Sequence, residues 1–190
     1  MTLTSSWLEV VCCIPRTKHQ QKLRPLTMAT QIFLNAALIG VGATAFMDLI
    51  ALAQKHVLSQ QPLNYAMVGR WFGHMIRGKF VHRPISASRP IPFERVTGWS
   101  SHYLIGVLFA LAFLALVGDG WLKAPSLLPA LAFGALTVLA PFLVVQPGMG
   151  AGLFARNLPN PNVARLKSAF AHLSFGIGLW AAACCASAFS

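Results

Sequence analysis

Four long apolar runs alternate with shorter polar segments along this 190-residue chain. They extend over about residues 29–53, 93–117, 127–145 and 161–188. Each is close to the roughly 20 residues with which an α-helix crosses about 30 Å of hydrocarbon. Since backbone polar groups in lipid must bond to one another, each run is predicted to be a helix. The pattern indicates an all-α, polytopic membrane protein with four transmembrane helices in one domain, residues 28–190.

Proline and capping residues mark the ends of these runs. Pro92 and Glu94 open the second run, where a proline and an acidic side chain suit the start of a helix. Pro141 lies inside the third run and predicts a kink. The glycine-rich segment 146–152 predicts a turn, with a re-entrant segment as the alternative.

The connection between the first two runs, residues 54–92, is the longest of the chain. Residues 63–77 within it place five apolar side chains on one helical face and both arginines off that face. This pattern is typical of an amphipathic helix that lies in the headgroup plane. Three prolines predict an extended strap for the second half of the connection. His74 and His82 are expected at the surface.

Composition narrows the class of protein. Hydrophobic residues make up 56% of the sequence and charged residues only 10%, whereas soluble domains carry about 25% charged residues. These values exclude a soluble enzyme, a disordered chain and a disulfide scaffold. The formal net charge of +11 suits a membrane surface, and a chain this apolar is not expected to bind nucleic acid. No C-x-x-C motif occurs.

Basic residues are concentrated on one side of the predicted bundle. Ten lie in or beside the first and third connections, against one on the other side when the chain is counted from Met28, or five with the whole chain included. The ten are Lys55, Arg70, Arg77, Lys79, Arg83, Arg89, Arg95, Arg156, Arg165 and Lys167. Positive charge marks the cytoplasmic side. The prediction is a bacterial inner-membrane location, with the amphipathic helix in the cytoplasm and both termini in the periplasm.

Polar side chains inside the spans are functional hypotheses because they are costly in lipid. Asp48, His102 and His172 are the ionisable ones, and Gln146 ends the third span at the same level. In the helices that carry Asp48, His102 and His172, small residues recur every four positions on the same face as these side chains, which indicates close helix packing. These four side chains are therefore expected to converge inside the bundle. The same small-residue faces are candidates for contacts in a homo-oligomer.

The pattern Arg-x6-His-x3-Gly occurs in two of the spans. Its members are Arg95, His102 and Gly106 in the second span and Arg165, His172 and Gly176 in the fourth. Seven residues are close to two helical turns, so each arginine is expected below its histidine, at headgroup level. Interfacial arginines commonly contact lipid phosphate. Arg70, Arg77, Arg95 and Arg165 are the predicted anion or lipid-headgroup contacts. Two explanations of the pattern stay open: duplication of a two-helix unit, and chance.

Three interpretations of the intramembrane Asp and His side chains stay open. They form a structural hydrogen-bond network, they carry protons or a solute, or they bind a metal or catalyse a reaction. A metal site needs three or four suitable ligands, and no local motif such as H-E-x-x-H occurs. The sequence therefore assigns no catalytic residue, no metal ligand and no cofactor.

Residues 1–27 differ in character from the rest. They carry four basic residues and no apolar run long enough to cross a membrane. Their short apolar stretch precedes the basic residues, which is not the order in a secretory signal. Met28 directly precedes the first span. The segment is predicted to be a disordered extension, or to precede the natural start of translation.

Three segments have motifs specific enough to compare with a known family. Residues 38–48, 63–74 and 146–150 read LIGVGATAFMD, LNYAMVGRWFGH and QPGMG. Together they resemble a bacterial family of small four-helix inner-membrane proteins known as a domain of unknown function. The resemblance implies a membrane location and a fold, and it carries no activity. Members of that family begin near Met28, so residues 1–27 depart from the pattern.

These observations predict an integral inner-membrane protein that is a structural or accessory component in contact with the lipid bilayer. The alternative is a small proton- or solute-coupled transporter that uses the intramembrane Asp and His side chains. A membrane enzyme is less favoured, because no catalytic signature is recognised.

Overall fold

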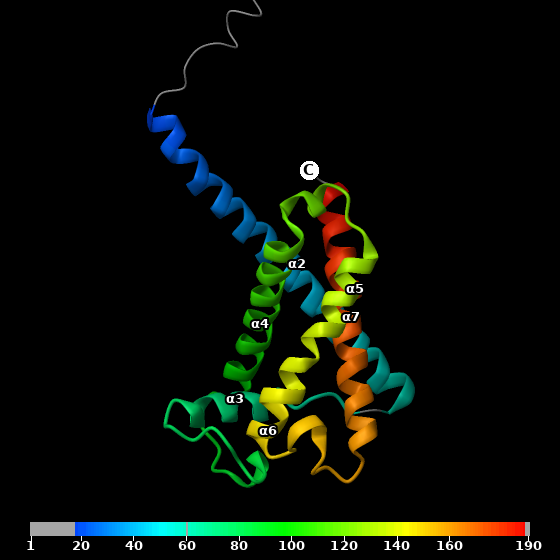
Figure 1. Cartoon of the computed structure of the whole chain (residues 1–190). Helices are drawn as coiled ribbons and strands as arrows, with labels where there is room; N and C mark the ends of the chain where they lie inside the picture. Colours follow the sequence, from blue (N-terminus) through cyan, green and yellow to red (C-terminus); the bar gives the residue numbers. More distant parts are fainter. Residues whose placement is uncertain (1–17, 60, 189–190) are drawn as a thin grey trace, which may run out of the picture.

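The computed structural model describes residues 18–59 and 61–188, and within these ranges the chain forms helices and no strand. Four of the helical segments are long and apolar enough to cross a membrane. They lie side by side as a bundle (Figure 1). The predicted fold class, an all-α protein with four candidate transmembrane helices, is confirmed.

The second and fourth spans lie close to the predicted boundaries. They are α4 (Glu94–Val117) and α7 (Pro161–Ala188). The first, α2 (Lys18–Leu58), is longer than predicted, and its apolar part is Ala29–Val57. Part of the predicted extension is therefore helical and continues into α2. The rest of it lies outside the described residues, and a start at Met28 stays a prediction.

The third span is interrupted at its proline, as predicted. α5 (Leu127–Thr137) ends four residues before Pro141, because a proline nitrogen cannot donate to the carbonyl one turn earlier. A wider π-helical turn, η3 (Pro141–Val145), follows. In it the amide of Gln146 donates to the carbonyl of Pro141, five residues back.

The glycine-rich segment after this kink ends the span and then turns. α6 (Gln146–Met149) stops at Gly150, which has φ 98°, a left-handed conformation that glycine adopts without strain. The short η4 (Leu153–Ala155) follows and leads into α7. The predicted turn is therefore present but begins at Gly150, because residues 146–149 still form the last helical turn of the span.

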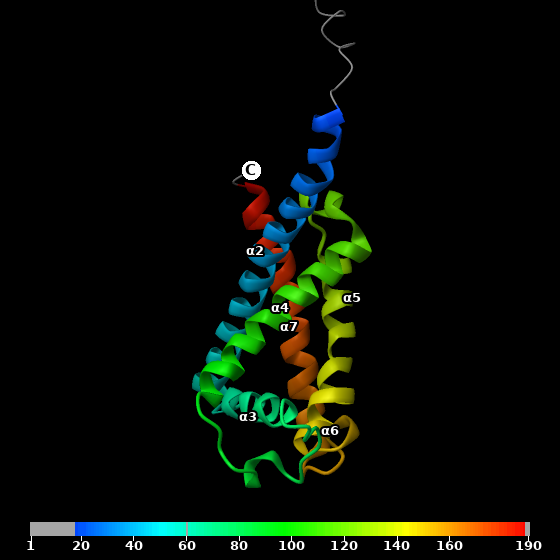
Figure 2. The ribbon, with the colours of Figure 1, turned by 90° about the vertical axis from the view of Figure 1, so that its left-hand side faces the viewer.

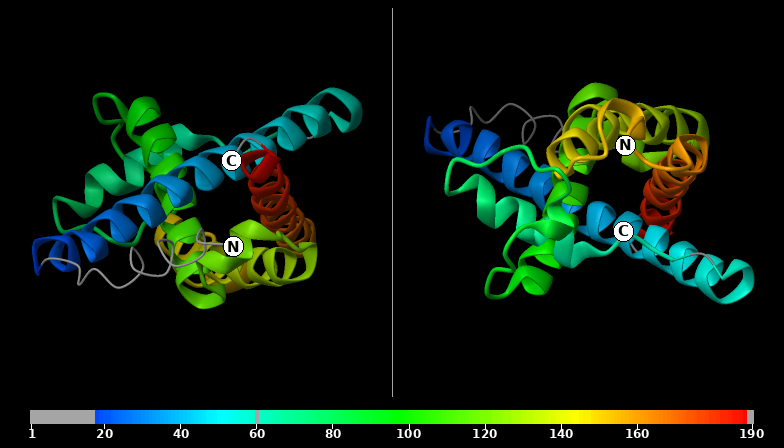
Figure 3. Two further views of the ribbon diagram at one scale, coloured as in Figure 1. Left: turned by 90° about the horizontal axis from the view of Figure 1, so that it is seen from above. Right: turned by 90° about the horizontal axis from the view of Figure 1, so that it is seen from below.

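α2 is the central helix of the packing order. It contacts α4 on one side and α7 on the other, and α7 also contacts α5. Figure 3 shows that α2 crosses the bundle obliquely and that its ends project beyond the other helices. A Cβ added to Gly40 would lie 2.7 Å from Cα of Val107, and one added to Gly178 would lie 2.8 Å from Cα of Ala43. The small-residue faces are therefore occupied by contacts within the chain.

Aromatic packing closes the end of the bundle near η2 (Asp119–Lys123). Phe113 is fully buried, with its ring centroid 4.7 Å from that of Trp121 and 5.3 Å from that of Phe133. Large apolar side chains remain exposed on the helices. Among them are Leu34, Leu38, Leu49, Leu104, Leu108, Leu128, Leu136, Leu143 and Leu166. Such surfaces suit contact with lipid acyl chains.

α3 (Tyr65–Met75) lies across the opposite end of the bundle, against α4 (Figure 2). The side chain of Asn64 caps its first turn. The helix predicted within residues 63–77 is thus present, but only part of its apolar face is exposed, and the rest packs inside the protein. Val68 and Trp71 are buried in the protein, whereas Ile76 is 89% exposed.

Two glycines allow α3 and α4 to touch. A Cβ added to Gly69 would overlap the carbonyl oxygen of Glu94, and one added to Gly98 would overlap that of Tyr65. Only hydrogen at these two positions lets the backbones approach so closely. The crossing places the polar side chains of α3 beside α4 and the interior of the bundle.

The strap, residues 76–93, returns to α4 beneath α3 and contains η1 (Ile85–Ala87). His82 is 2% exposed, so the expectation that it lies at the surface is wrong. Its amide and its Nδ1 both donate to the carbonyl of Gly148, at 2.9 and 3.3 Å. The strap therefore docks on α6, a contact between residues 66 positions apart that no local pattern reveals.

Candidate functional site: an intramembrane polar network

Side chains from three helices meet where α3 crosses the bundle. Nε2 of His102 on α4 lies 3.1 Å from Oδ1 of Asp48 on α2. The hydroxyl of Tyr65, the first residue of α3, lies 3.0 Å from the same Nε2 and donates to the same Oδ1 at 3.4 Å. The His102 and Asp48 side chains are only 12% and 19% exposed. These three residues form the Asp48 network.

The hydrogen bonds of the Asp48 network follow from its chemistry. An ionised carboxylate can only accept hydrogen bonds, so Oδ1 accepts them from His102 and Tyr65. Burial, followed by the Asp48 charge, raises the pKa of the Tyr65 hydroxyl well above its ordinary value. Tyr65 therefore stays protonated and remains a donor. Its ring also stacks on that of His102, with the centroids 4.3 Å apart.

His172 belongs to a second, separate pair. Its Nδ1 lies 2.8 Å from Oγ1 of Thr137 on α5, which itself donates to the carbonyl of Gly134 at 2.7 Å. Because the hydroxyl has one proton, Nδ1 of His172 must be the donor in their contact. Nε2 of a neutral His172 then remains an acceptor.

Gln146 forms a third pair. Its Nε2 donates to Oγ of Ser168 on α7 at 3.1 Å. Its Oε1 is buried and has no hydrogen-bond partner among the described residues. The same is true of the second carboxylate oxygen of Asp48, Oδ2. Two acceptor atoms inside the bundle are thus unsatisfied, which is uncommon for buried polar groups.

The predicted convergence of four polar side chains is therefore only partly realised. Asp48 and His102 are in direct contact, whereas His172 and Gln146 each have their own partner. In the described part of the chain, no three His, Cys, Asp or Glu side chains lie together as a metal site.

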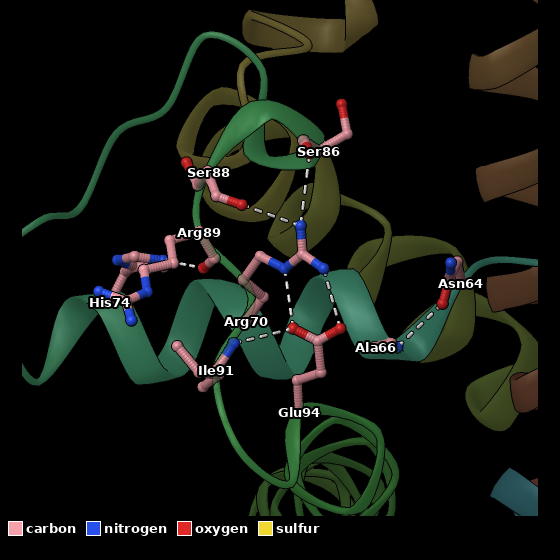
Figure 4. A network of polar contacts seen from close by, with 9 residues as sticks. All are labelled: Asn64, Ala66, Arg70, His74, Ser86, Ser88, Arg89, Ile91 and Glu94. Atoms are coloured by element: carbon pink, nitrogen blue, oxygen red, sulfur yellow. Dashed lines mark hydrogen bonds and ion pairs between the residues drawn. The ribbon is translucent and has the colours of Figure 1, made fainter.

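Arg70 differs most from its expected role as a headgroup contact. It is 7% exposed, and its Nε and NH2 donate to the two carboxylate oxygens of Glu94 at 2.8 and 2.9 Å (Figure 4). Its NH1 donates to the carbonyls of Ser86 and Ser88 in the strap. The hydrogen bond to Glu94 raises the pKa of Arg70 further. Arg70 thus fastens α3, α4 and the strap together.

The other three predicted headgroup arginines lie at the same end of the bundle. Arg77 and Arg95 are exposed there. Arg165 is half-buried, with its Nε donating to the carbonyl of Phe154 at 2.8 Å and its NH1 to Asn162 at 3.0 Å. Arg77 and Arg95 keep the exposure that a headgroup contact needs, whereas Arg165 anchors the turn before α7.

Sequence reasoning missed the partners of these groups, namely Tyr65, Thr137, Ser168 and Glu94. Tyr65 lies 17 residues from Asp48 and 37 from His102, so no helical spacing connects them. A usable signal was the position of Tyr65 directly after a capping asparagine, which places it at the start of α3. Its orientation depends on the crossing of α3 over α4.

The helices and the buried polar network define a multi-pass, all-helical membrane protein. A family model described as "Protein of unknown function (DUF2938)" matches residues 37–186, and the chain belongs to this family. The matched range includes every residue of the Asp48 network, of the His172–Thr137 pair and of the Gln146–Ser168 pair. No curated protein and no solved structure matches the chain.

Proposed function

We propose that this protein is a structural or accessory component of the membrane in which α3 is held as a rigid platform at one end of the bundle. The observation that carries the proposal is the Asp48 network. Its three side chains come from α2, α3 and α4 and use one another as hydrogen-bond partners. Paired polar groups in a bundle most often fasten helices.

The stability of two variants tests this role. Removing one partner leaves a buried polar group unpaired, so His102→Ala is expected to lower the free energy of unfolding by about 1–3 kcal/mol. Asp48→Asn is expected to melt earlier as well, because a neutral amide attracts His102 less. The measurement is thermal unfolding of the purified proteins in detergent.

Ser101→Ala is the matched control for these variants. In the described part of the chain the Ser101 hydroxyl bonds to the carbonyl of Thr97, on its own helix, so its removal should leave the melting temperature nearly unchanged. Wild-type melting of both Asp48→Asn and His102→Ala would contradict the structural role.

The second candidate is a proton- or solute-coupled transporter. It is favoured by the free Oδ2 of Asp48, a buried acceptor without a partner among the described residues. For this function, Asp48→Asn should keep its stability and lose proton flux. The measurement is the pH inside liposomes, read with a trapped pH-sensitive dye after a pH jump.

We also propose a bacterial inner-membrane location with the α3 end of the bundle in the cytoplasm. The support is charge: ten basic residues lie in or beside the connections at the α3 end, against Lys123 between α4 and α5, or five when residues 1–27 are included in the count. The start of α2 and the end of α7 lie at the opposite end (Figure 1). The proposal includes the lipid bilayer as a partner. The small-residue faces proposed for a homo-oligomer make contacts within the chain at Gly40 and Gly178, so a second copy would use other parts of these helices.

Reporter fusions test the orientation. Fusions after Ser88 in the strap and after Asn157 before α7 are expected to report cytoplasm. A fusion after Ser190 is expected to report periplasm, because the positive-inside rule places the basic connections in the cytoplasm. A paired phosphatase and fluorescent-protein reporter at each site is the measurement. A cytoplasmic signal after Ser190 would reverse the proposed topology.

A further inference from the structure

A pocket of about 700 Å³ lies between the end of α3 and the strap, away from the Asp48 network. Its side chains include His74, Lys79, His82, Arg83 and Arg89, and no acidic residue is among those that line it. Three of the five carry a fixed positive charge. We call this feature the strap pocket.

The backbone around the strap pocket is held in place by donors from α3. NH1 of Arg70 donates to the carbonyls of Ser86 and Ser88, and Nε2 of His74 donates to the carbonyl of Arg89 at 3.0 Å (Figure 4). Nε1 of Trp71 donates to the carbonyl of Phe80 at 2.8 Å. These acceptors of the strap are therefore already occupied. The polar groups left to face a ligand are mainly cationic side chains.

The positive charge of the strap pocket is not balanced by a neighbouring acid. Glu94, the acidic residue that follows the strap, is committed to Arg70. Lys79, Arg83 and Arg89 are exposed, and none of them forms an ion pair among the described residues. An anion that enters the pocket would therefore meet several free cations at short range.

The ring of His82 lies among the same positive charges. Burial lowers the pKa of its ring, and the neighbouring Lys79 and His74 lower it further, although its hydrogen bond to Gly148 opposes the shift. Its Nε2 is buried and has no hydrogen-bond partner among the described residues. The ring is neutral and held by Gly148, so it forms a fixed wall beside the free cations.

We propose that the strap pocket binds a phosphate group through Lys79, Arg83 and Arg89. Guanidinium groups match phosphate oxygens in a bidentate geometry, and lysine adds a point charge. Val81, which lines the pocket, is 61% exposed, and its neighbour in sequence Phe80 is 57% exposed. A cationic pocket with an apolar rim suits an anionic phospholipid headgroup, and free inorganic phosphate has the same chemistry. This site goes beyond the proposed structural role.

The test compares two triple variants with equal loss of charge. The pocket variant is Lys79→Gln/Arg83→Gln/Arg89→Gln. The control is Lys55→Gln/Arg156→Gln/Lys167→Gln, which removes three exposed charges at the α3 end of the bundle, in α2, in the segment before α7 and in α7. Native mass spectrometry of the full chain in detergent measures bound phosphatidylglycerol and, separately, phosphatidylcholine. A thermal shift with inorganic phosphate forms the second arm.

Wild type and control are expected to bind phosphatidylglycerol in preference to phosphatidylcholine. The pocket variant should bind it roughly a hundredfold more weakly, because three basic residues at about 1 kcal/mol each near the surface correspond to about two powers of ten. A phosphate-dependent rise in melting temperature that the pocket variant lacks would support the site with free phosphate as the source. Binding in neither arm, or equal loss in both triple variants, overturns the proposal. If the pocket variant melts early without ligand, the single Arg83→Glu replaces it, with an expected loss of roughly thirtyfold because it changes the charge by two.

Discussion

Replacing Gly98 by alanine is expected to lower the free energy of unfolding by about 3 kcal/mol, the upper part of the range for overpacked sites. The new Cβ would overlap the carbonyl oxygen of Tyr65, and a backbone atom cannot rotate away as a flexible side chain can. α3 must then move off α4, which also separates the hydroxyl of Tyr65 from Asp48 and His102. Thermal unfolding in detergent measures the loss, and faster tryptic cleavage of the strap reports the displacement of α3.

Gly120→Ala is the matched control for this prediction. Gly120 lies in η2 at the other end of the bundle, and nothing lies within 4 Å of a Cβ added there. Its melting temperature and its cleavage pattern should equal those of the wild type. Equal stability of Gly98→Ala and Gly120→Ala would show that α3 and α4 are further apart than described.

Arg70→Ala is the second substitution with a large expected effect. It removes both hydrogen bonds to Glu94 and the two hydrogen bonds from NH1 to the strap carbonyls of Ser86 and Ser88. Breaking a buried ion pair by deleting one partner is strongly destabilising, about 3–5 kcal/mol. Because the side chain of Glu94 is 19% exposed and can recruit water, we expect a value of about 3 kcal/mol.

Two further variants separate charge from geometry at this position. Arg77→Ala also removes one positive charge, at the start of the strap, but Arg77 is exposed, so little change in stability is expected. Arg70→Lys keeps the charge and loses the planar arrangement of donors, so it should lie between wild type and Arg70→Ala. If Arg77→Ala and Arg70→Ala melted alike, the ion pair would not be what holds α3 to α4. The measurement is again thermal unfolding in detergent.

The spans could be predicted because the signals for them are local. Length and apolar character define a membrane helix residue by residue, so the limits of α4 and α7 were close to those predicted. Pro141 breaks the third span because a proline lacks the backbone donor, which is true in any surrounding structure. The capped helix α3 follows from its amphipathic period in the same way.

The candidate site could be predicted only in part, for a reason that is equally physical. Helical spacing shows that Asp48 and His102 face inward, but it does not show which side chains of other helices they meet. Thr137 and Ser168, the partners of His172 and Gln146, depend on how α5 and α6 lie against α7. The sequence does not show whether a small polar residue in a span hydrogen-bonds to a side chain of another helix or only occupies space.

The sequence by itself determined the class of protein, because a chain that is 56% hydrophobic and 10% charged must place four long apolar helices in lipid. Only the tertiary structure decided where α3 packs. Gly69 and Gly98 allow α3 to lie on α4, so Tyr65 joins the Asp48 network and Arg70 becomes buried against Glu94. The same crossing places the strap beneath α3, with His82 on α6 and its free cations around one pocket. Such contacts depend on the distance between backbones far apart in the chain, which the periodicity of single helices does not contain.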